Sequence, residues 1–262
     1  MNHHTSLASE DSKIIKKRLK QFYDKEAQKY YETRQKYRKD VDYLLDEVKS
    51  LHKSKIKILE FWCWGGRFIK YLREHYEGEI EYIGVDLSSE LLKFAQKDNP
   101  HDTFICNDIC KEVLNYEQET FDLIVGTSSF QHIPTKQERS FLIKHFYRIL
   151  KYEGKFLMLN RTYSDWFVKK YKKQVFLSKL KRFFTLWNCS WRDIEVPWTN
   201  RQWETSYRYY HLFDLKEYKN LIDYSGFSLK KCCYLDNQGE ITLNEHASKS
   251  SLFIAEKYPF QR

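Results

Sequence analysis

Short apolar runs recur through the middle of the chain, and each ends close to a glycine or an acidic residue. Residues 56–61, 82–85 and 121–125 have the length and the aliphatic and aromatic content of strands that are covered on both faces. Between them apolar positions return at helical spacing, as in residues 68–72. The alternation of such strands and helices over residues 56–160 predicts an α/β fold with a doubly wound, mostly parallel sheet.

The same patterns divide the chain into five parts. The cap before the sheet is expected to hold two helices, and the insertion is expected to be mostly helical and looped. After the insertion, a helix that ends at Gly226 precedes two final strands, which bring the predicted sheet to seven. The parts are a disordered polar N-terminus (1–12), a helical cap (13–55), the sheet core (56–163), an insertion (164–212) and a C-terminal part (213–262).

The turn after the first predicted strand has the features of a nucleotide-cofactor site. The strand ends at Glu60, and Gly65 and Gly66 come just before a predicted helix. Glycine lets a ligand approach the backbone, and a helix start presents free N–H groups to an anion. The next strand ends at Asp86, twenty residues after Gly66, where a carboxylate suits ribose hydroxyls. A third strand ends at Asp108, so three acids are expected along one edge of the sheet.

These segments resemble the class I S-adenosylmethionine-dependent methyltransferases over roughly residues 20–160. ILEFWCWGGRF is similar to their first motif, VDLS to the second, NDI to the third and FDLIVGTSSFQHIP to their fourth strand. The resemblance implies a Rossmann-like methyltransferase sheet that binds S-adenosylmethionine, with residues 23–34 as a lid helix. The cofactor-binding residues that it implies are Glu60, Cys63, Gly65, Gly66, Asp86, Leu87, Asp108, Ile109 and Thr127.

A narrower resemblance covers residues 191–227, which are similar to the C-terminal half of the tRNA wobble-uridine carboxymethyl O-methyltransferases. The shared segments are VPW at 196–198, RYYHLF at 208–213 and Thr33–Arg34 near the start. The paired histidines of that family appear here as Gln131–His132, so the first histidine is missing. The resemblance implies tRNA as the substrate and, because that family often works with one, a small activating protein partner.

The acceptor decides which side chains methyl transfer needs. A carboxylate is already nucleophilic and needs orientation, which arginine gives in bidentate form, so Arg34 and Arg208 are the candidates for holding an anionic acceptor. A phenol, catechol or amine would benefit from a general base, for which His132 and His211 are the candidates. His132 follows the fourth strand, at the edge where open α/β sheets bind ligands. A structural role is the alternative for both histidines.

The net charge of +9 is concentrated in two segments. Residues 13–39 hold eleven Lys/Arg against three Asp/Glu, and residues 165–202 hold nine against three. Aromatic residues interleave with the second cluster, and such side chains together bind phosphates and unpaired bases. This favours an RNA substrate, although the solvated helix faces of a small-molecule enzyme have a similar composition.

Other features of the composition limit the class of protein. The chain has no apolar run of membrane-spanning length, which predicts no membrane association. Its six cysteines lack the paired spacing of a zinc site, which predicts no bound metal. We therefore expect a reduced, cytoplasmic protein.

Two tryptophans disturb the glycine turn, because Trp62 and Trp64 stand where the first motif has glycine. An indole at either position would occupy the space for the methionine part of the cofactor. Three accounts are open: a lost site that leaves a binding module, a rebuilt loop that still binds, and UGA codons translated as tryptophan although the source cell reads them as glycine. The composition, 8 glycines and 7 tryptophans in 262 residues, favours the third account. Trp187 and Trp203 look like further sites of this kind.

The sequence thus favours an S-adenosylmethionine-dependent methyltransferase that O-methylates a carboxylate on the wobble uridine of tRNA. One alternative is a small-molecule, quinone-type O-methyltransferase on the same fold. The other is a methyltransferase-like binding module that is inactive because Trp62 and Trp64 block the cofactor loop.

Overall fold

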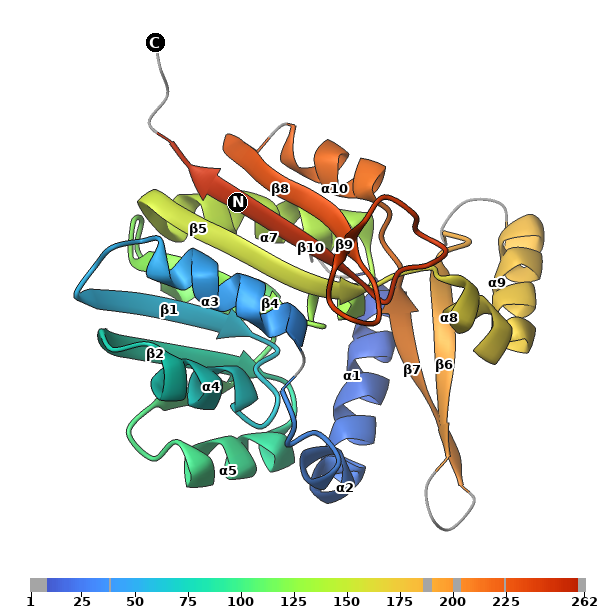
Figure 1. Cartoon of the computed structure of the whole chain (residues 1–262). Coiled ribbons are helices and arrows are strands. Elements are labelled where there is room, and N and C mark those ends of the chain that lie inside the picture. Colours follow the sequence, from blue (N-terminus) through green and yellow to red (C-terminus); the bar gives the residue numbers. More distant parts are fainter. Residues whose placement is uncertain (1–8, 38, 186–189, 200–203, 224, 259–262) are drawn as a thin grey trace, which may run out of the picture.

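An eight-stranded sheet forms the centre of the molecule (Figure 1). The computed structural model describes residues 9–37, 39–185, 190–199, 204–223 and 225–258, except for the side chains of 181–185. The strand order is β3-β2-β1-β4-β5-β10-β8-β9. The strands are β1 (Lys55–Phe61), β2 (Glu79–Asp86), β3 (Thr103–Cys106), β4 (Phe121–Thr127), β5 (Leu150–Arg161), β8 (Phe227–Leu235), β9 (Ile241–Thr242) and β10 (Ser250–Lys257).

Strand directions confirm the Rossmann-like, mostly parallel sheet. Strands β1 to β5 pair in parallel, while β10 runs antiparallel between β5 and β8. The two final strands pair as the sequence predicts. The predicted number of seven was wrong, because the two-residue strand β9 adds an eighth beside β8. A segment this short carries no readable alternation, so no pattern along the chain could predict it.

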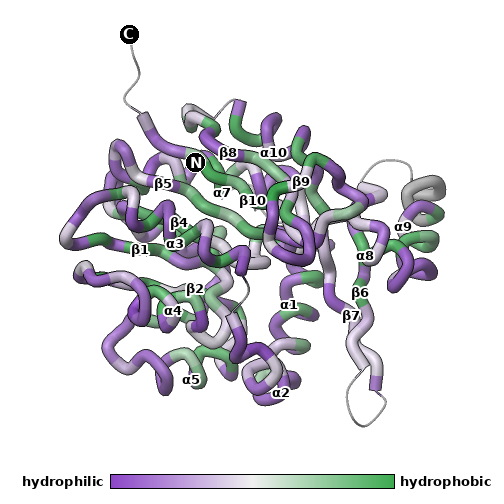
Figure 2. Tube along the Cα trace, viewed as in Figure 1, coloured by the Kyte–Doolittle hydropathy of each residue, from purple (hydrophilic) through white to green (hydrophobic). Residues whose placement is uncertain are grey.

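Helices cover both faces of this sheet. They are α1 (Glu10–Lys25), α2 (Ala27–Glu32), α3 (Asp42–Lys49), α4 (Arg67–His75), α5 (Ser89–Asp98), α6 (Ile109–Glu112), α7 (Lys136–Ile149) and α10 (Leu215–Ile222), with 3-10 turns at η1 (Lys39–Val41), η2 (Val113–Asn115) and η3 (Phe130–His132). Alternate strand residues enter two separate cores: Ile124 packs with α7 and α10, whereas Leu123 and Val125 pack with α3 and α4. Apolar residues follow the strands in Figure 2, as expected of strands buried on both faces.

The N-terminal cap has one more helix than predicted. Only α1 and α2 lie over the carboxyl ends of the strands, beside α5 and the ribbon strand β7 (Thr205–His211) (Figure 1). Helix α3 instead packs on one face of the sheet through Leu44, Leu45 and Val48. The segment that can cover a ligand is therefore α1–α2.

The insertion is helical only in its first half. Helices α8 (Asp165–Lys170) and α9 (Lys172–Thr185) lead into an antiparallel ribbon of β6 (Asp193–Thr199) and β7. Our expectation of a mostly helical and looped insertion is wrong for this second half, where alternate residues such as Ile194 and Val196 are buried. That alternation is the signature of a strand with one covered face.

Candidate cofactor and acceptor site

The turn after β1 has a left-handed backbone at alternate residues. The angle φ is +53° at Trp62, +55° at Trp64 and +69° at Gly66. The amide of Cys63 donates to Val85 O (3.1 Å), and that of Gly66 donates to Cys63 O (3.0 Å). The turn is therefore fixed against β2, and its shape is one that favours glycine at three positions.

The two indoles fill the space between this turn and the lid helices. Trp62 is buried and stacks on His132, with ring centroids 4.9 Å apart. Trp64 stacks on Tyr30 at 5.0 Å, and its Nε1 donates to Thr127 O at 3.0 Å. Tyr23 lies edge-on to both indoles. The rings form one aromatic cluster over the carboxyl ends of β1 and β4.

Two of the predicted acids are buried below this cluster. Glu60 is fully buried and accepts from the Tyr82 hydroxyl (2.5 Å) and the Thr127 hydroxyl (3.3 Å), and burial raises its pKa to about 8. Asp86 accepts from the amides of Ser88 (2.8 Å) and Trp64 (3.0 Å), and burial raises its pKa to about 6. Glu60 is thus a neutral acid at pH 7, whereas Asp86 remains largely ionised.

The third acid is held by a residue that the sequence did not reveal. Asp108 lies two residues beyond the end of β3 and caps α6, where its Oδ1 accepts from the Cys110 amide at 3.0 Å. Its Oδ2 is 2.6 Å from Nζ of Lys16, which also contacts Glu138 at 2.7 Å. A lysine among many in a basic helix gave no signal, although its position on the apolar face of α1 could have marked it.

The remaining predicted cofactor residues lie around the same strand ends. Leu87 is half-buried directly after Asp86, and Ile109 is buried in the first turn of α6. Gly65 faces the Tyr31 ring, which a Cβ atom at this position would approach to 3.2 Å. The Cys63 thiol is buried, and burial raises its pKa.

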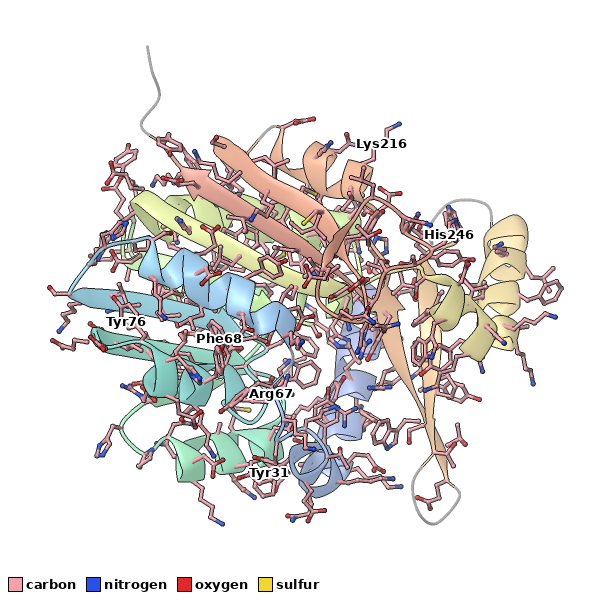
Figure 3. The ribbon with its side chains drawn as sticks, viewed as in Figure 1. Tyr31, Arg67, Phe68, Tyr76, Lys216 and His246 are labelled. Carbon is pink, nitrogen blue, oxygen red and sulfur yellow. The ribbon has the colours of Figure 1, made fainter. Side chains whose placement is uncertain are left out.

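Arg67 ties the lid to the core. Its Nη1 donates to Arg34 O (3.0 Å) and Lys36 O (3.4 Å). In Figure 3, Arg67 lies at the start of α4, and Tyr31 lies where α2 meets α5. Tyr31 in turn stacks on Phe94 and donates to Asp98 at 2.6 Å. The chain after α2 is therefore held next to the turn of β1.

A buried arginine lies next to the aromatic cluster. The Arg208 side chain points from β7 toward α1, with its guanidinium 5.3 Å from the Phe22 ring and 5.1 Å from the Trp198 ring. It is 5% exposed, and its Nε has no hydrogen-bond partner. Among the residues that the structure describes, no carboxylate forms an ion pair with it. Within the described ranges, Arg208 is therefore a buried cation that has the Tyr23 hydroxyl as a neighbour but no carboxylate as an ion-pair partner.

Arg34 and His132 both contact rings of the aromatic cluster or of the residues next to it. The Arg34 guanidinium is 3.8 Å from the Tyr30 ring and 5.1 Å from the Trp198 ring, so both predicted arginines flank one indole. His132 is fully buried, with Nδ1 3.0 Å from Tyr209 O and Nε2 3.4 Å from the Tyr23 hydroxyl. Burial, with a smaller contribution from the charge of Arg208, lowers the His132 pKa to about 3, so its imidazole is neutral.

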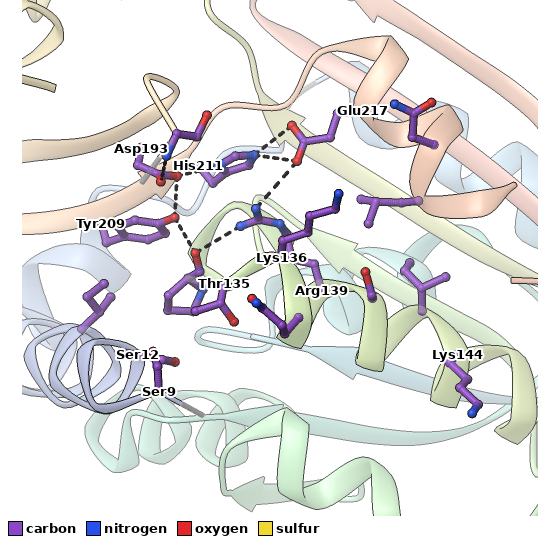
Figure 4. A pocket seen from close by; sticks show the side chains of 18 of the residues that line it. Ser9, Ser12, Thr135, Lys136, Arg139, Lys144, Asp193, Tyr209, His211 and Glu217 are labelled. Atoms are coloured by element: carbon purple, nitrogen blue, oxygen red, sulfur yellow. Dashed lines mark hydrogen bonds and ion pairs between the residues drawn. The ribbon is translucent and has the colours of Figure 1, made fainter. Parts of the chain in front are cut away.

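His211 is not brought together with these residues. It alternates with Tyr210 along β7, so its side chain lies on the opposite face of the ribbon from Arg208 and Tyr210. There its ring contacts Asp193 (2.6 Å) and Glu217 (2.9 Å), and these residues line a separate open groove along α7 (Figure 4). Both ring nitrogens are engaged, which is the geometry of a structural histidine.

The described part of the chain has neither a metal-binding cluster nor a membrane-spanning helix. Across the described residues, no three His, Cys, Asp or Glu side chains form a group that could hold a metal ion. None of the described helices has the length and apolarity needed to cross a bilayer.

Comparison with known proteins gives the domain type. Residues 59–158 match a family model described as a methyltransferase domain. This range starts in β1 and ends in β5, and it contains the turn and the three acids. No curated protein matches the chain.

Solved structures share the fold at low sequence identity. A SAM-dependent methyltransferase from Methanosarcina mazei has a TM-score of 0.59 at 19% identity, over 79% of this chain and 94% of that one. DhpI in complex with SAH has a TM-score of 0.60 at 10% identity, over 96% and 100%. A methyltransferase from Haloferax volcanii, solved with the activator Trm112, has a TM-score of 0.51 at 13% identity, over 78% and 83%.

Solved structures with this fold are described as SAM-dependent methyltransferases, and one of them holds SAH. Asp86, Leu87 and Ile109 lie at or just beyond the ends of β2 and β3, where the sequence resemblance expects the adenosine part of the cofactor. The space next to the turn of β1, where the methionine part would lie, holds the Trp62 and Trp64 rings. With these two side chains in place, the second half of the site does not fit the cofactor.

Proposed function

We propose that this chain, an S-adenosylmethionine-dependent methyltransferase by its domain and fold, O-methylates a carboxylate, with the wobble uridine of tRNA as the favoured substrate. S-adenosylmethionine supplies an electrophilic methyl group when bound. The observation that supports an anionic acceptor is Arg208, a cation that is 5% exposed and has no anion beside it among the described residues. Burial of an unpaired charge is unfavourable, so the site is incomplete until an anion enters.

The chemistry of the neighbours agrees with a carboxylate. A guanidinium holds a carboxylate through two parallel hydrogen bonds and thereby fixes its direction. His132 is neutral, buried and hydrogen-bonded at both ring nitrogens, so it is poorly placed to act as a base. A carboxylate acceptor needs no base, and orientation by Arg208 is then the main contribution of the protein.

The tRNA part of the proposal rests on charge and on exposed rings. Trp166 is 56% exposed on α8, Phe176 is 63% exposed on α9, and the ammonium of Lys170 lies 4.8 Å from the Trp166 ring. Such surfaces bind phosphates and stack on unpaired bases. We further propose a cytoplasmic location and a small activating protein as a partner. A neighbour on this fold is described in complex with such an activator.

A small-molecule acceptor is the second candidate, and the depth of Arg208 favours it. The Arg208 guanidinium is 5% exposed and lies where α1 packs against β7, a depth that suits a small acid better than a nucleotide in a folded tRNA. Transfer of labelled methyl into bulk tRNA, compared with transfer into a small-molecule extract, separates the two. This assay uses the Trp62→Gly/Trp64→Gly chain.

Arg208 can be tested in the same background. Arg208→Met should lower kcat/KM for an anionic acceptor by a factor that corresponds to about 2–5 kcal/mol of lost binding free energy. Arg208→Lys should recover part of this activity, because lysine keeps the charge but not the bidentate geometry. Arg18→Met, at an exposed arginine that pairs with Glu195, is the control and should change little. Equal loss of activity in all three variants, or no loss in Arg208→Met, would contradict the proposal.

A further inference from the structure

The backbone of the turn does not suit the side chains that it carries. In the described ranges, six non-glycine residues have a positive φ. Four of them have smaller or flexible side chains: His52, Glu119, Ser128 and Glu153. The other two, Trp62 and Trp64, have large aromatic side chains. A left-handed backbone brings Cβ close to neighbouring backbone atoms, and bulky side chains adopt it rarely. Two such residues on either side of Cys63 make the turn a glycine turn in geometry.

We propose that residues 62 and 64 are glycine in the protein made by the source cell, and that both tryptophans stand for UGA codons. The inference rests on the cofactor site of the proposed function, but not on the acceptor. Removal of both indoles would leave a space bounded by the Tyr23, Tyr30 and His132 rings and by Thr127 O, groups that the indoles now contact. This space adjoins the Asp86 end of the site, since the amide of residue 64 already binds Asp86.

The other tryptophans in the described ranges do not show this conflict. Trp166, Trp191 and Trp198 have no left-handed backbone. Trp198 donates to Glu26 at 3.1 Å, and Trp191 packs edge-on against Tyr163. We therefore expect ordinary UGG codons at 191 and 198. Trp187 and Trp203, which the sequence also suggested, lie outside the described residues.

The composition is consistent with this inference. Glycine makes up 8 of 262 residues, about 3%, against roughly 7% in an average protein, while tryptophan is present 7 times. Translation of glycine codons as tryptophan lowers one count and raises the other.

The codons and the native peptide test the inference directly. UGA at codons 62 and 64 supports it, and UGG at either position overturns it. Where UGA is found, the protein of the source cell can be digested with trypsin. Trypsin releases residues 58–67, because it cleaves after Lys57 and after Arg67. A peptide mass with glycine at both positions supports the inference, and a mass with tryptophan at either overturns it.

Binding supplies a second test that does not depend on methyl transfer. Calorimetry with S-adenosylhomocysteine should give no measurable binding for the chain as written and saturable binding for Trp62→Gly/Trp64→Gly. Trp62→Ala/Trp64→Ala opens the same space but keeps a Cβ at positive φ, so its affinity should lie at least about tenfold below that of the double glycine variant. Glu153→Gly is the control, because it relieves a left-handed residue remote from the turn and should leave binding undetectable.

The outcomes separate this inference from the proposed function. Binding by the chain as written, at an affinity equal to that of the double glycine variant, overturns the inference. No binding by a double glycine variant whose circular dichroism matches the parent also overturns it. Binding by that variant without methyl transfer to tRNA or to small acids supports the inference and counts against the proposed acceptor.

Discussion

Glu60 is a carboxyl group enclosed by the core, directly below the turn of β1. Its side chain has no cation within ion-pair distance among the described residues, and its hydrogen bonds come from two hydroxyls, those of Tyr82 and Thr127. Burial raises its pKa to about 8, so the folded state holds a proton that the unfolded chain releases near pH 4.5. Glu60 therefore links stability to pH.

The expected effect of Glu60 is a loss of stability as pH rises. Between about pH 4.5 and 8 the folded state binds one more proton than the unfolded state, so this group lowers the free energy of unfolding across that window. Glu60→Gln removes the contribution, because the amide cannot ionise. Denaturant unfolding at pH 5 and pH 8 measures this effect. The free energy of unfolding of the variant should rise relative to that of the parent as pH rises, by at most on the order of 4 kcal/mol.

A surface acid provides the control for this comparison. Glu81 pairs with Lys57 and is 47% exposed, so Glu81→Gln should follow the parent at both pH values. His132, whose pKa is lowered to about 3, acts in the opposite direction in parent and variant alike and cancels from the difference. A constant difference between Glu60→Gln and the parent from pH 5 to pH 8 would refute the assignment.

Helix α1 is fixed to the sheet core by one buried ion-pair network. Lys16 is 8% exposed and contacts Asp108 and Glu138. Ser12, one turn earlier, donates to both oxygens of Glu138. The residues on the inner face of α1 are thus both polar and apolar, and the polar ones set the position of the lid over the strand ends.

Removal of the cation should loosen this helix. Lys16→Met leaves Glu138 buried with hydroxyl partners only, and loss of one partner of a buried pair costs about 3–5 kcal/mol. We expect a drop of that order in the free energy of unfolding and faster hydrogen exchange in residues 10–25. Lys13→Met, at an exposed lysine paired with Glu10, should change stability by less than about 0.5 kcal/mol. Equal effects of the two substitutions would contradict this role.

The whole molecule has a basic insertion that stands out from the sheet. Helices α8 and α9 and the ribbon β6–β7 project to one side (Figure 1). The lysines at 169, 170, 172 and 173 lie on these two helices, while neighbouring apolar residues form a small separate core. Charge reversal in this region should therefore alter binding without altering the fold of the sheet.

The tRNA proposal predicts a specific salt dependence. Reversal of the four lysines at 169–173 to Glu should weaken tRNA binding. It should also make the negative slope of log K against log salt shallower, by about 0.7–0.9 for each phosphate that the protein no longer neutralises. Reversal of four exposed lysines on other helices, at 49, 97, 111 and 216, makes the same change in net charge and should reduce the slope less. Filter binding at several salt concentrations measures both. Identical slopes for the two variants would leave only a non-specific charge effect and would contradict a tRNA surface on the insertion.

Local patterns alone determined the α/β class, the succession of strands from β1 to β5, and the presence of acids at or just beyond the ends of β1, β2 and β3. They could do so because periodicity and strand-end residues are properties of adjacent positions. Only the tertiary structure decided the eighth strand, the ribbon within the insertion, and the role of Lys16 in binding Asp108. It also placed His211 on the opposite face of the ribbon from Arg208, left Arg208 buried without an anion among the described residues, and gave residues 62 and 64 a left-handed backbone. These features depend on what lies opposite a residue in space, which no spacing along the chain records.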